Sequence, residues 1–161
     1  VEHFLDERPQ LTFIEPYPDR LDALLRDEDR GTCDVLVQRV QDVPLERFTA
    51  LEADDILVID SSHVSKTGSD VNHLYFEVLP RLAPGVLVHV HYIGYPFEYP
   101  RAWVDQGRSW NEAYLLRAFL TFNSAYQIEL WNGCLRALRP EAFDGVPNLR
   151  GGSQIWMRRT A

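Results

Sequence analysis

Apolar residues gather along the chain in six short runs separated by polar turns. Most of these runs are rich in the β-branched and aromatic residues that favour strands. The clearest run reads ILVI between Asp55 and Asp60, and apolar side chains at consecutive positions are typical of a parallel strand buried on both faces. The pattern predicts strands at residues 11–14, 33–37, 55–60, 86–90, 126–131 and 154–158.

Helical spacing follows two of these runs. Ser69 is a suitable N-cap, and apolar residues from Val71 to Leu82 then recur every three or four positions until a Pro-Gly pair. After an aromatic and proline-rich loop, a second apolar stripe predicts a helix that faces the core through Tyr114, Leu115, Ala118, Phe119 and Phe122. Short helices are expected near residues 19–25 and 45–51, and a surface loop between the last two strands.

Alternating strands and helices predict an α/β fold. We expect an open, mostly parallel sheet with helices on both faces and an antiparallel strand pair at the C-terminal end. In such sheets, binding sites lie at the carboxyl ends of the strands. No repeat or linker interrupts the pattern, so residues 1–161 are predicted to form a single domain.

The composition excludes several classes of partner. Lys and Arg number 16 against 24 Asp and Glu, a net charge of -8, so we expect no nucleic acid and no anionic membrane as partner. No apolar run reaches the roughly 18 residues of a membrane helix, and the N-terminus lacks a signal-peptide pattern. Cys33 and Cys134 are far apart and are expected to be reduced thiols. These features predict a cytoplasmic protein.

Polar residues stand at the ends of the first three predicted strands. An acid at the end of such a strand can accept hydrogen bonds from both ribose hydroxyls of a nucleotide, because a carboxylate is only an acceptor. A solvated loop acid is the alternative at each position. The candidate residues are Glu15 after the first strand, Gln41 and Asp42 after the second, and Asp60, Ser61 and His63 after the third.

The fourth predicted strand carries two histidines in the sequence VHVHYIGYP. His89 and His91 are two positions apart, so their side chains share one face of the strand. We expect His89 to serve packing. His91 is either a packed core histidine or part of a site at the strand end.

The segments at 12–16, 40–43, 59–63 and 82–91, taken in order, resemble class I S-adenosylmethionine-dependent methyltransferases. The resemblance runs from about Leu11 to Val90. It implies a Rossmann-like fold and transfer of a methyl group from S-adenosylmethionine to a small hydroxyl-bearing molecule.

The resemblance also implies residue roles. Glu15 would bind the cofactor ribose, and Asp42 with Gln41 would lie beside the adenine. Asp60, Ser61 and His63 would face the methionine end and the substrate. His63 or His91 is the candidate base for the acceptor proton, since an imidazole with a pKa of about 6.5 suits neutral pH, and Asp60 belongs to the same predicted catalytic group.

Tyr92 departs from the pattern of metal-assisted relatives, which carry aspartate there. A phenol is a poor ligand for Mg²⁺, so no metal is expected. His63, His91 and Asp60 could still supply the two histidines and one carboxylate of a metal-dependent oxygenase, which is a third and weaker hypothesis.

The family's glycine-rich loop should precede Glu15 by about 20 residues, and this position falls before Val1. We therefore expect the first strand and its loop to be missing. Because that strand lies at the centre of the family's sheet, its absence leaves unpaired backbone groups that favour self-association. A non-catalytic remnant that serves as an interaction or assembly module is the alternative function.

The loop after Tyr92 is rich in aromatic side chains and prolines. Tyr92, Tyr95 and Trp103 are predicted to bind the substrate, because aromatic residues beside a carboxylate and a guanidinium suit a lid over an apolar or sugar-like molecule. Packing of the sheet's open end is the alternative.

Overall fold

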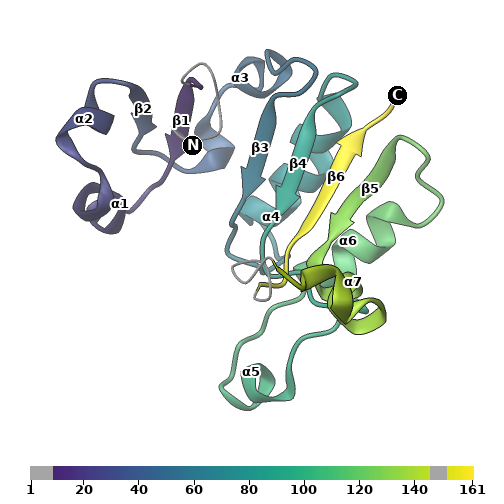
Figure 1. The fold of residues 1–161 in the computed structure, drawn as a ribbon. Coiled ribbons are helices and arrows are strands. Elements are labelled where there is room, and N and C mark those ends of the chain that lie inside the picture. The colour runs from purple at the N-terminus through teal and green to yellow at the C-terminus, as the bar shows by residue number, and fades with distance from the viewer. Residues whose placement is uncertain (1–8, 146–151) are drawn as a thin grey trace. The chain divides into compact units, whose positions relative to one another are not determined.

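The computed structural model describes residues 9–145 and 152–161. The chain separates into two compact units, with the division between Val43 and Pro44. Figure 1 shows the elements of both.

The first unit is built around a pair of parallel strands. β1 (Leu11–Ile14) and β2 (Cys33–Leu36) pair in register from Leu11 opposite Cys33 to Ile14 opposite Leu36. Parallel strands need a crossover connection, which here contains α1 (Asp19–Leu24) and α2 (Asp27–Arg30). A 3-10 turn (Val40–Asp42) follows. The predicted strands are confirmed, with β2 one residue shorter than expected.

The second unit contains a four-stranded mixed sheet with the order β3-β4-β6-β5. β3 and β4 are parallel, whereas β6 is antiparallel to both of its neighbours. The predicted antiparallel pair at the C-terminal end is therefore confirmed. The strands are β3 (Ile56–Ile59), β4 (Leu87–Val90), β5 (Tyr126–Trp131) and β6 (Ile155–Arg159).

A mostly parallel sheet was expected, and this detail is wrong. Two sheets are present among the described residues, and only one strand pair of the larger sheet is parallel. β3 is an edge strand of its sheet, and no strand among the described residues links it to β1. The mixed α/β architecture itself is confirmed.

The helices of the second unit are short and several are irregular. Ser69 caps α4 as predicted, and its Oγ accepts a hydrogen bond from the Asn72 N–H at 3.2 Å. α4 passes into a π-helical stretch (Leu74–Val78) and then a 3-10 turn (Leu79–Arg81). The other helical elements are α3 (Glu46–Thr49), α5 (Arg101–Asp105), α6 (Glu112–Leu120), α7 (Asn132–Leu138) and a 3-10 turn (Pro140–Phe143), with α4 spanning Asp70–His73.

α7 and the 3-10 turn after it occupy a segment that was predicted to be a surface loop. Trp131 anchors the start of this segment, because its indole N–H donates to the Ile93 carbonyl at 3.0 Å. Phe143 is buried at the other end. These two apolar anchors hold a helix that the Gly and Arg content did not suggest.

The core lies on one face of the larger sheet. Val88 and Val90 of β4 and Ile155 and Met157 of β6 are fully buried there, and α4 and α6 lie behind the sheet in Figure 1. Ile56 and Val58 on the opposite face of β3 are 52% and 61% exposed. The prediction that both faces of this strand are buried is therefore wrong.

α6 faces the core through only part of the predicted stripe, since Phe119 packs against the buried Tyr75 and Tyr126. Tyr114 and Phe122, which lies just beyond the helix, are exposed, whereas the buried residues of α6 are Glu112, Ala113 and Leu116. The reason is that Glu112 bonds to groups at the end of β3, which sets the rotation of the helix. Among the described residues, no helix is long and apolar enough to cross a membrane.

Candidate functional site

His63 follows β3 in a strained backbone conformation. Its φ is +59°, in the left-handed region that residues other than glycine rarely adopt. Its N–H donates to Ser61 Oγ at 3.0 Å, and its carbonyl accepts the N–H groups of Asn111 at 2.9 Å and Glu112 at 3.2 Å. These bonds tie the end of β3 to the start of α6. Such strain persists where surrounding contacts fix the backbone, and it is frequent at functional sites.

Glu112 is fully buried beside this histidine. Its Oε2 accepts the Ser61 hydroxyl at 2.8 Å and lies 2.7 Å from His63 Nδ1. The other ring nitrogen, Nε2, lies 3.5 Å from Asp60 Oδ1, and the Asp60 side chain is 66% exposed. The imidazole therefore lies between a buried and an exposed carboxylate.

The second carboxylate oxygen of Glu112 is also buried. Among the described residues, Glu112 Oε1 and the Tyr75 hydroxyl are buried atoms without a hydrogen-bond partner of standard geometry. Burial raises the pKa of Tyr75 well above its ordinary value, and the nearby Glu112 raises it further. The phenol therefore keeps its proton next to the carboxylate.

Aromatic rings cover the open side of His63. Trp110 lies 4.3 Å from the imidazole, measured between ring centroids, and Tyr92 approaches it edge-on at 5.5 Å. Tyr92 also contacts the His91 ring at 4.2 Å. The structure thus brings His63, His91 and Tyr92 together at the carboxyl ends of β3 and β4.

His89 and His91 lie on one face, as their spacing predicted. Their rings are nearly parallel, with centroids 5.7 Å apart, and His89 packs edge-on against Trp156 at 4.6 Å. Burial, and then the neighbouring His91, lower the pKa of His89, while Asp60 acts in the opposite direction. This packing agrees with the core role expected for His89. Within the residues that the structure describes, no group of three His, Cys, Asp or Glu side chains is placed to hold a metal ion.

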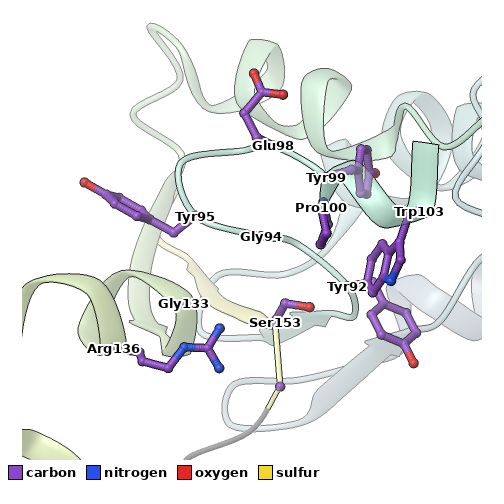
Figure 2. A pocket seen from close by; sticks show the side chains of 11 residues that line it. Tyr92, Gly94, Tyr95, Glu98, Tyr99, Pro100, Trp103, Gly133, Arg136 and Ser153 are labelled. Carbon is purple, nitrogen blue, oxygen red and sulfur yellow. The ribbon is translucent and has the colours of Figure 1, made fainter. Parts of the chain in front are cut away.

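A cavity of about 470 Å³ lies beside this histidine cluster. It is lined by all three residues that were predicted to bind the substrate, Tyr92, Tyr95 and Trp103. Figure 2 shows the Tyr92 and Trp103 rings against each other, while Arg136 extends from α7 towards the side where Ser153 lies. The cavity is therefore mainly aromatic, with polar groups supplied by Glu98, Arg136 and Ser153.

The loop that forms much of the cavity wall is fastened to α6. The Tyr99 hydroxyl accepts the Ala113 N–H at 2.9 Å, and the Tyr114 hydroxyl donates to Glu98 at 2.9 Å. Burial raises the pKa of Tyr99 to about 12 against the opposing effect of the Ala113 bond. The loop's aromatic side chains thus both line the cavity and pack against the helix.

The predicted nucleotide-binding residues belong to the first unit. Glu15 is half-buried after β1, and its Oε1 accepts the Tyr17 N–H at 2.9 Å. Arg39 donates to both oxygens of Asp42 at 2.8 and 2.9 Å, and these bonds lower the pKa of Asp42. Gln41 is half-buried in the same 3-10 turn.

Residues 2–93 match a family described as a methyltransferase domain. The chain belongs to this methyltransferase family. No curated protein and no solved structure matches the chain significantly. The family match begins before β1 and ends just after Tyr92.

The matched part of the methyltransferase contains every predicted site residue except Tyr95 and Trp103. Glu112 lies outside it and was not predicted as a site residue. Helical spacing could have indicated Glu112, since it shares the buried face of α6 with Ala113 and Leu116. An apolar stripe does not include a carboxylate, so the hydrophobic pattern alone did not indicate that Glu112 is buried.

Proposed function

We propose that the protein transfers a methyl group from S-adenosylmethionine to the hydroxyl group of a small molecule bound in the aromatic cavity. The observation that carries this proposal is the position of Tyr92. Its side chain lines the cavity and also contacts the rings of both His63 and His91. A hydroxyl-bearing molecule in the cavity would then lie close to a base.

Glu15 is the proposed ligand for the cofactor ribose. Its half-buried carboxylate uses Oε1 to accept the Tyr17 N–H, and among the described residues no side chain donates to Oε2. This oxygen suits a ribose hydroxyl, which donates a hydrogen bond. Gln41 and Asp42 are proposed to lie beside the adenine. Both carboxylate oxygens of Asp42 already accept hydrogen bonds from Arg39.

Asp60 and Ser61 are proposed to face the methionine end of the cofactor. When bound, S-adenosylmethionine supplies a methyl group on a positively charged sulfur, and the bonding electron pair stays on that sulfur when the methyl leaves. The chain's own contribution is to orient the acceptor and to take up its proton. Positioning of reactants is the larger part of such catalysis.

His63 is the proposed base. Its Nδ1 is engaged by Glu112, so the proton of the acceptor hydroxyl passes to Nε2, the nitrogen on the side of Asp60. General base catalysis of this kind contributes roughly 10² to 10⁴ in rate. His91 is the second proposed member of the site through its contact with Tyr92. We propose no Mg²⁺ in this step, because Tyr92 stands where a carboxylate ligand would be needed.

A non-catalytic assembly module is the second proposed function, and the division into two sheets favours it. β3 is an edge strand, and its exposed Ile56 and Val58 would suit pairing or packing with another chain. Self-association and a cytoplasmic location remain part of the proposal.

Calorimetric titration with S-adenosylmethionine tests the two functions against each other. Binding to the wild type that Glu15→Ala abolishes, and that the exposed control Glu46→Ala retains, would support the methyltransferase. Release of S-adenosylhomocysteine with a panel of phenols, catechols and sugars would then identify the acceptor class. No heat at millimolar cofactor, together with a stable oligomer in light scattering, would favour the assembly module.

A further inference from the structure

Glu112 is the most completely buried acidic side chain of the second unit, and no part of the predicted site includes it. It is fully buried, lies beyond the family match and contacts His63 directly. Burial of a carboxylate costs several kcal/mol unless hydrogen bonds satisfy it. The hydrogen-bonding contacts of Glu112 with Ser61 and His63 offset part of this cost.

We propose that Glu112 is a positioning residue that holds a proton on His63 Nδ1 and so leaves Nε2 as the proton acceptor. This inference rests on the proposed function, in which His63 is the base. Glu112 itself touches neither the cavity nor any predicted cofactor residue other than Ser61.

The donor and acceptor roles follow from the partners of Oε2. The Ser61 hydroxyl already accepts the His63 N–H, so its own proton is available for Glu112 at 2.8 Å. Oε2 is then an acceptor, and His63 Nδ1 at 2.7 Å must be the donor. A neutral imidazole with its proton on Nδ1 carries its lone pair on Nε2.

The remaining oxygen of Glu112 is buried near a neutral phenol. Among the described residues, neither Tyr75 Oη nor Glu112 Oε1 has a hydrogen-bond partner of standard geometry. Burial and the proximity of Glu112 keep the phenol protonated by raising the pKa of Tyr75. Ser61 Oγ and His63 Nδ1 thus both meet Glu112 Oε2, while the phenol near the carboxylate stays uncharged.

The backbone fixes the ring as firmly as the side chains do. Both Asn111 and Glu112 donate their N–H groups to the His63 carbonyl. The Asn111 side chain bridges Ser65, accepting its N–H at 2.6 Å and donating to its carbonyl at 3.2 Å. Trp110 then covers one face of the imidazole at 4.3 Å. These contacts hold the imidazole where its Nδ1 meets Glu112.

Nitrogen NMR of protein labelled in its histidine rings decides this inference without an activity assay. Spectra would be recorded at about pH 8.5, above the ordinary range of imidazole pKa values. The ring-nitrogen signals of His63 would be assigned as those that are missing from the spectrum of His63→Asn. We expect a proton on Nδ1 and a bare Nε2 in the wild type. A proton on Nε2 of the wild type, in either the neutral ring or the imidazolium, would overturn the proposal.

Glu112→Gln tests the role of the carboxylate, with the exposed Glu46→Gln as its matched control. The amide of the variant donates as well as accepts, so we expect part of the His63 population to carry its proton on Nε2. The value of kcat should fall about 100-fold, the size of a general-base contribution, while the Kd for S-adenosylmethionine changes less than threefold. An unchanged tautomer with an unchanged kcat would show that Glu112 is only structural.

The two proposals fail in different ways. If the wild type transfers no methyl group to any acceptor, the proposed function is wrong, but the position of the ring proton still decides the role of Glu112. If Glu112→Gln does not fold, the wild-type spectrum alone gives the decision. Tyr75→Phe offers a milder variant, since it leaves the contacts of Glu112 Oε2 with Ser61 and His63 in place, so His63 should keep its proton on Nδ1; a shift of that proton to Nε2 would contradict the role given to Oε2.

Discussion

Glu112 Oε2 lies 2.7 Å from His63 Nδ1, although the two residues are 49 positions apart in the sequence. The contact joins the start of α6 to the loop after β3, and both partners are buried. Ser61 shares the same carboxylate oxygen. A single buried side chain therefore links the stability of the second unit to the geometry of its candidate site.

Glu112→Ala should destabilise the protein by about 3 kcal/mol. It removes the acceptor of two buried hydrogen bonds and leaves the His63 ring without its partner, and each unsatisfied buried group costs about 1–3 kcal/mol. Urea denaturation followed by tryptophan fluorescence measures the change. The exposed control Glu46→Ala should stay within about 0.5 kcal/mol of the wild type.

Equal effects of Glu112→Ala and Glu46→Ala would contradict this expectation. A double variant with Ser61→Ala adds a second check. The two residues share one hydrogen bond, so their separate effects should not add.

Much of the fold followed from local signals in the sequence. β1 and β5 begin and end where their apolar runs do, because Pro, Gly or polar turn residues bound those runs. Unpaired strand edges at the centre of the sheet were expected, but the division into two separate sheets and the antiparallel pairing of β6 with β4 were not predicted. Nothing local reports which strand edges will find a partner, since pairing depends on segments far away in the sequence.

The candidate site shows the same limit more sharply. His63, His91 and Tyr92 were predicted from strand ends, and the parallel pairing of β3 and β4 brings them together. Glu112 was not predicted as a site residue because its partners lie about fifty positions away in the sequence. An apolar stripe through Tyr114 and Phe122 also indicated a different face of α6. A buried carboxylate is recognisable only through its donors.

His89 should make the protein less stable as the pH falls. Burial lowers its pKa in the folded protein, so the unfolded chain binds a proton at higher pH than the folded one does. The contribution is fully present above the unfolded value of about 6.5 and is lost as the pH falls through the folded value. The measured free energy of unfolding should therefore decrease between about pH 8 and pH 5, the range that brackets the ordinary histidine pKa.

His89→Gln should flatten this part of the pH dependence, because the amide does not titrate. Glu46→Gln, at an exposed position, is the control and should leave the slope of the unfolding free energy against pH unchanged. An identical slope in wild type and His89→Gln would show that another group is responsible.

Arg108→Ala should loosen the loop between β4 and α6. The guanidinium lies 4.8 Å from the centroid of the Trp103 ring and 4.9 Å from that of Trp110, and its backbone N–H donates to the Trp103 carbonyl. Each such stacking contact contributes about 0.5–1 kcal/mol at an exposed site. Hydrogen exchange of peptides covering residues 97–111 should become faster, while that of β4 and β6 should not change.

Arg108→Lys separates stacking from charge. Lysine keeps the positive charge but lacks the planar group that stacks on both indoles, so we expect an intermediate increase in exchange. Protection equal to that of the wild type in Arg108→Ala would contradict the role given to this residue.

Trp103→Ala should weaken binding of the methyl acceptor. Trp103 lines the cavity and packs edge-on against Tyr92 at 5.3 Å, so its removal deletes apolar wall and leaves Tyr92 unsupported. Loss of one aromatic contact of about 1–3 kcal/mol corresponds to a KM about 5 to 150 times higher. The next residue, Val104, is exposed and is not part of the cavity, so Val104→Ala is the matched control and should keep the wild-type KM. The Kd for S-adenosylmethionine should be the same in all three proteins, because neither substituted residue is among its proposed ligands. A KM that rises equally in both variants, or a change confined to the cofactor Kd, would show that the acceptor binds elsewhere.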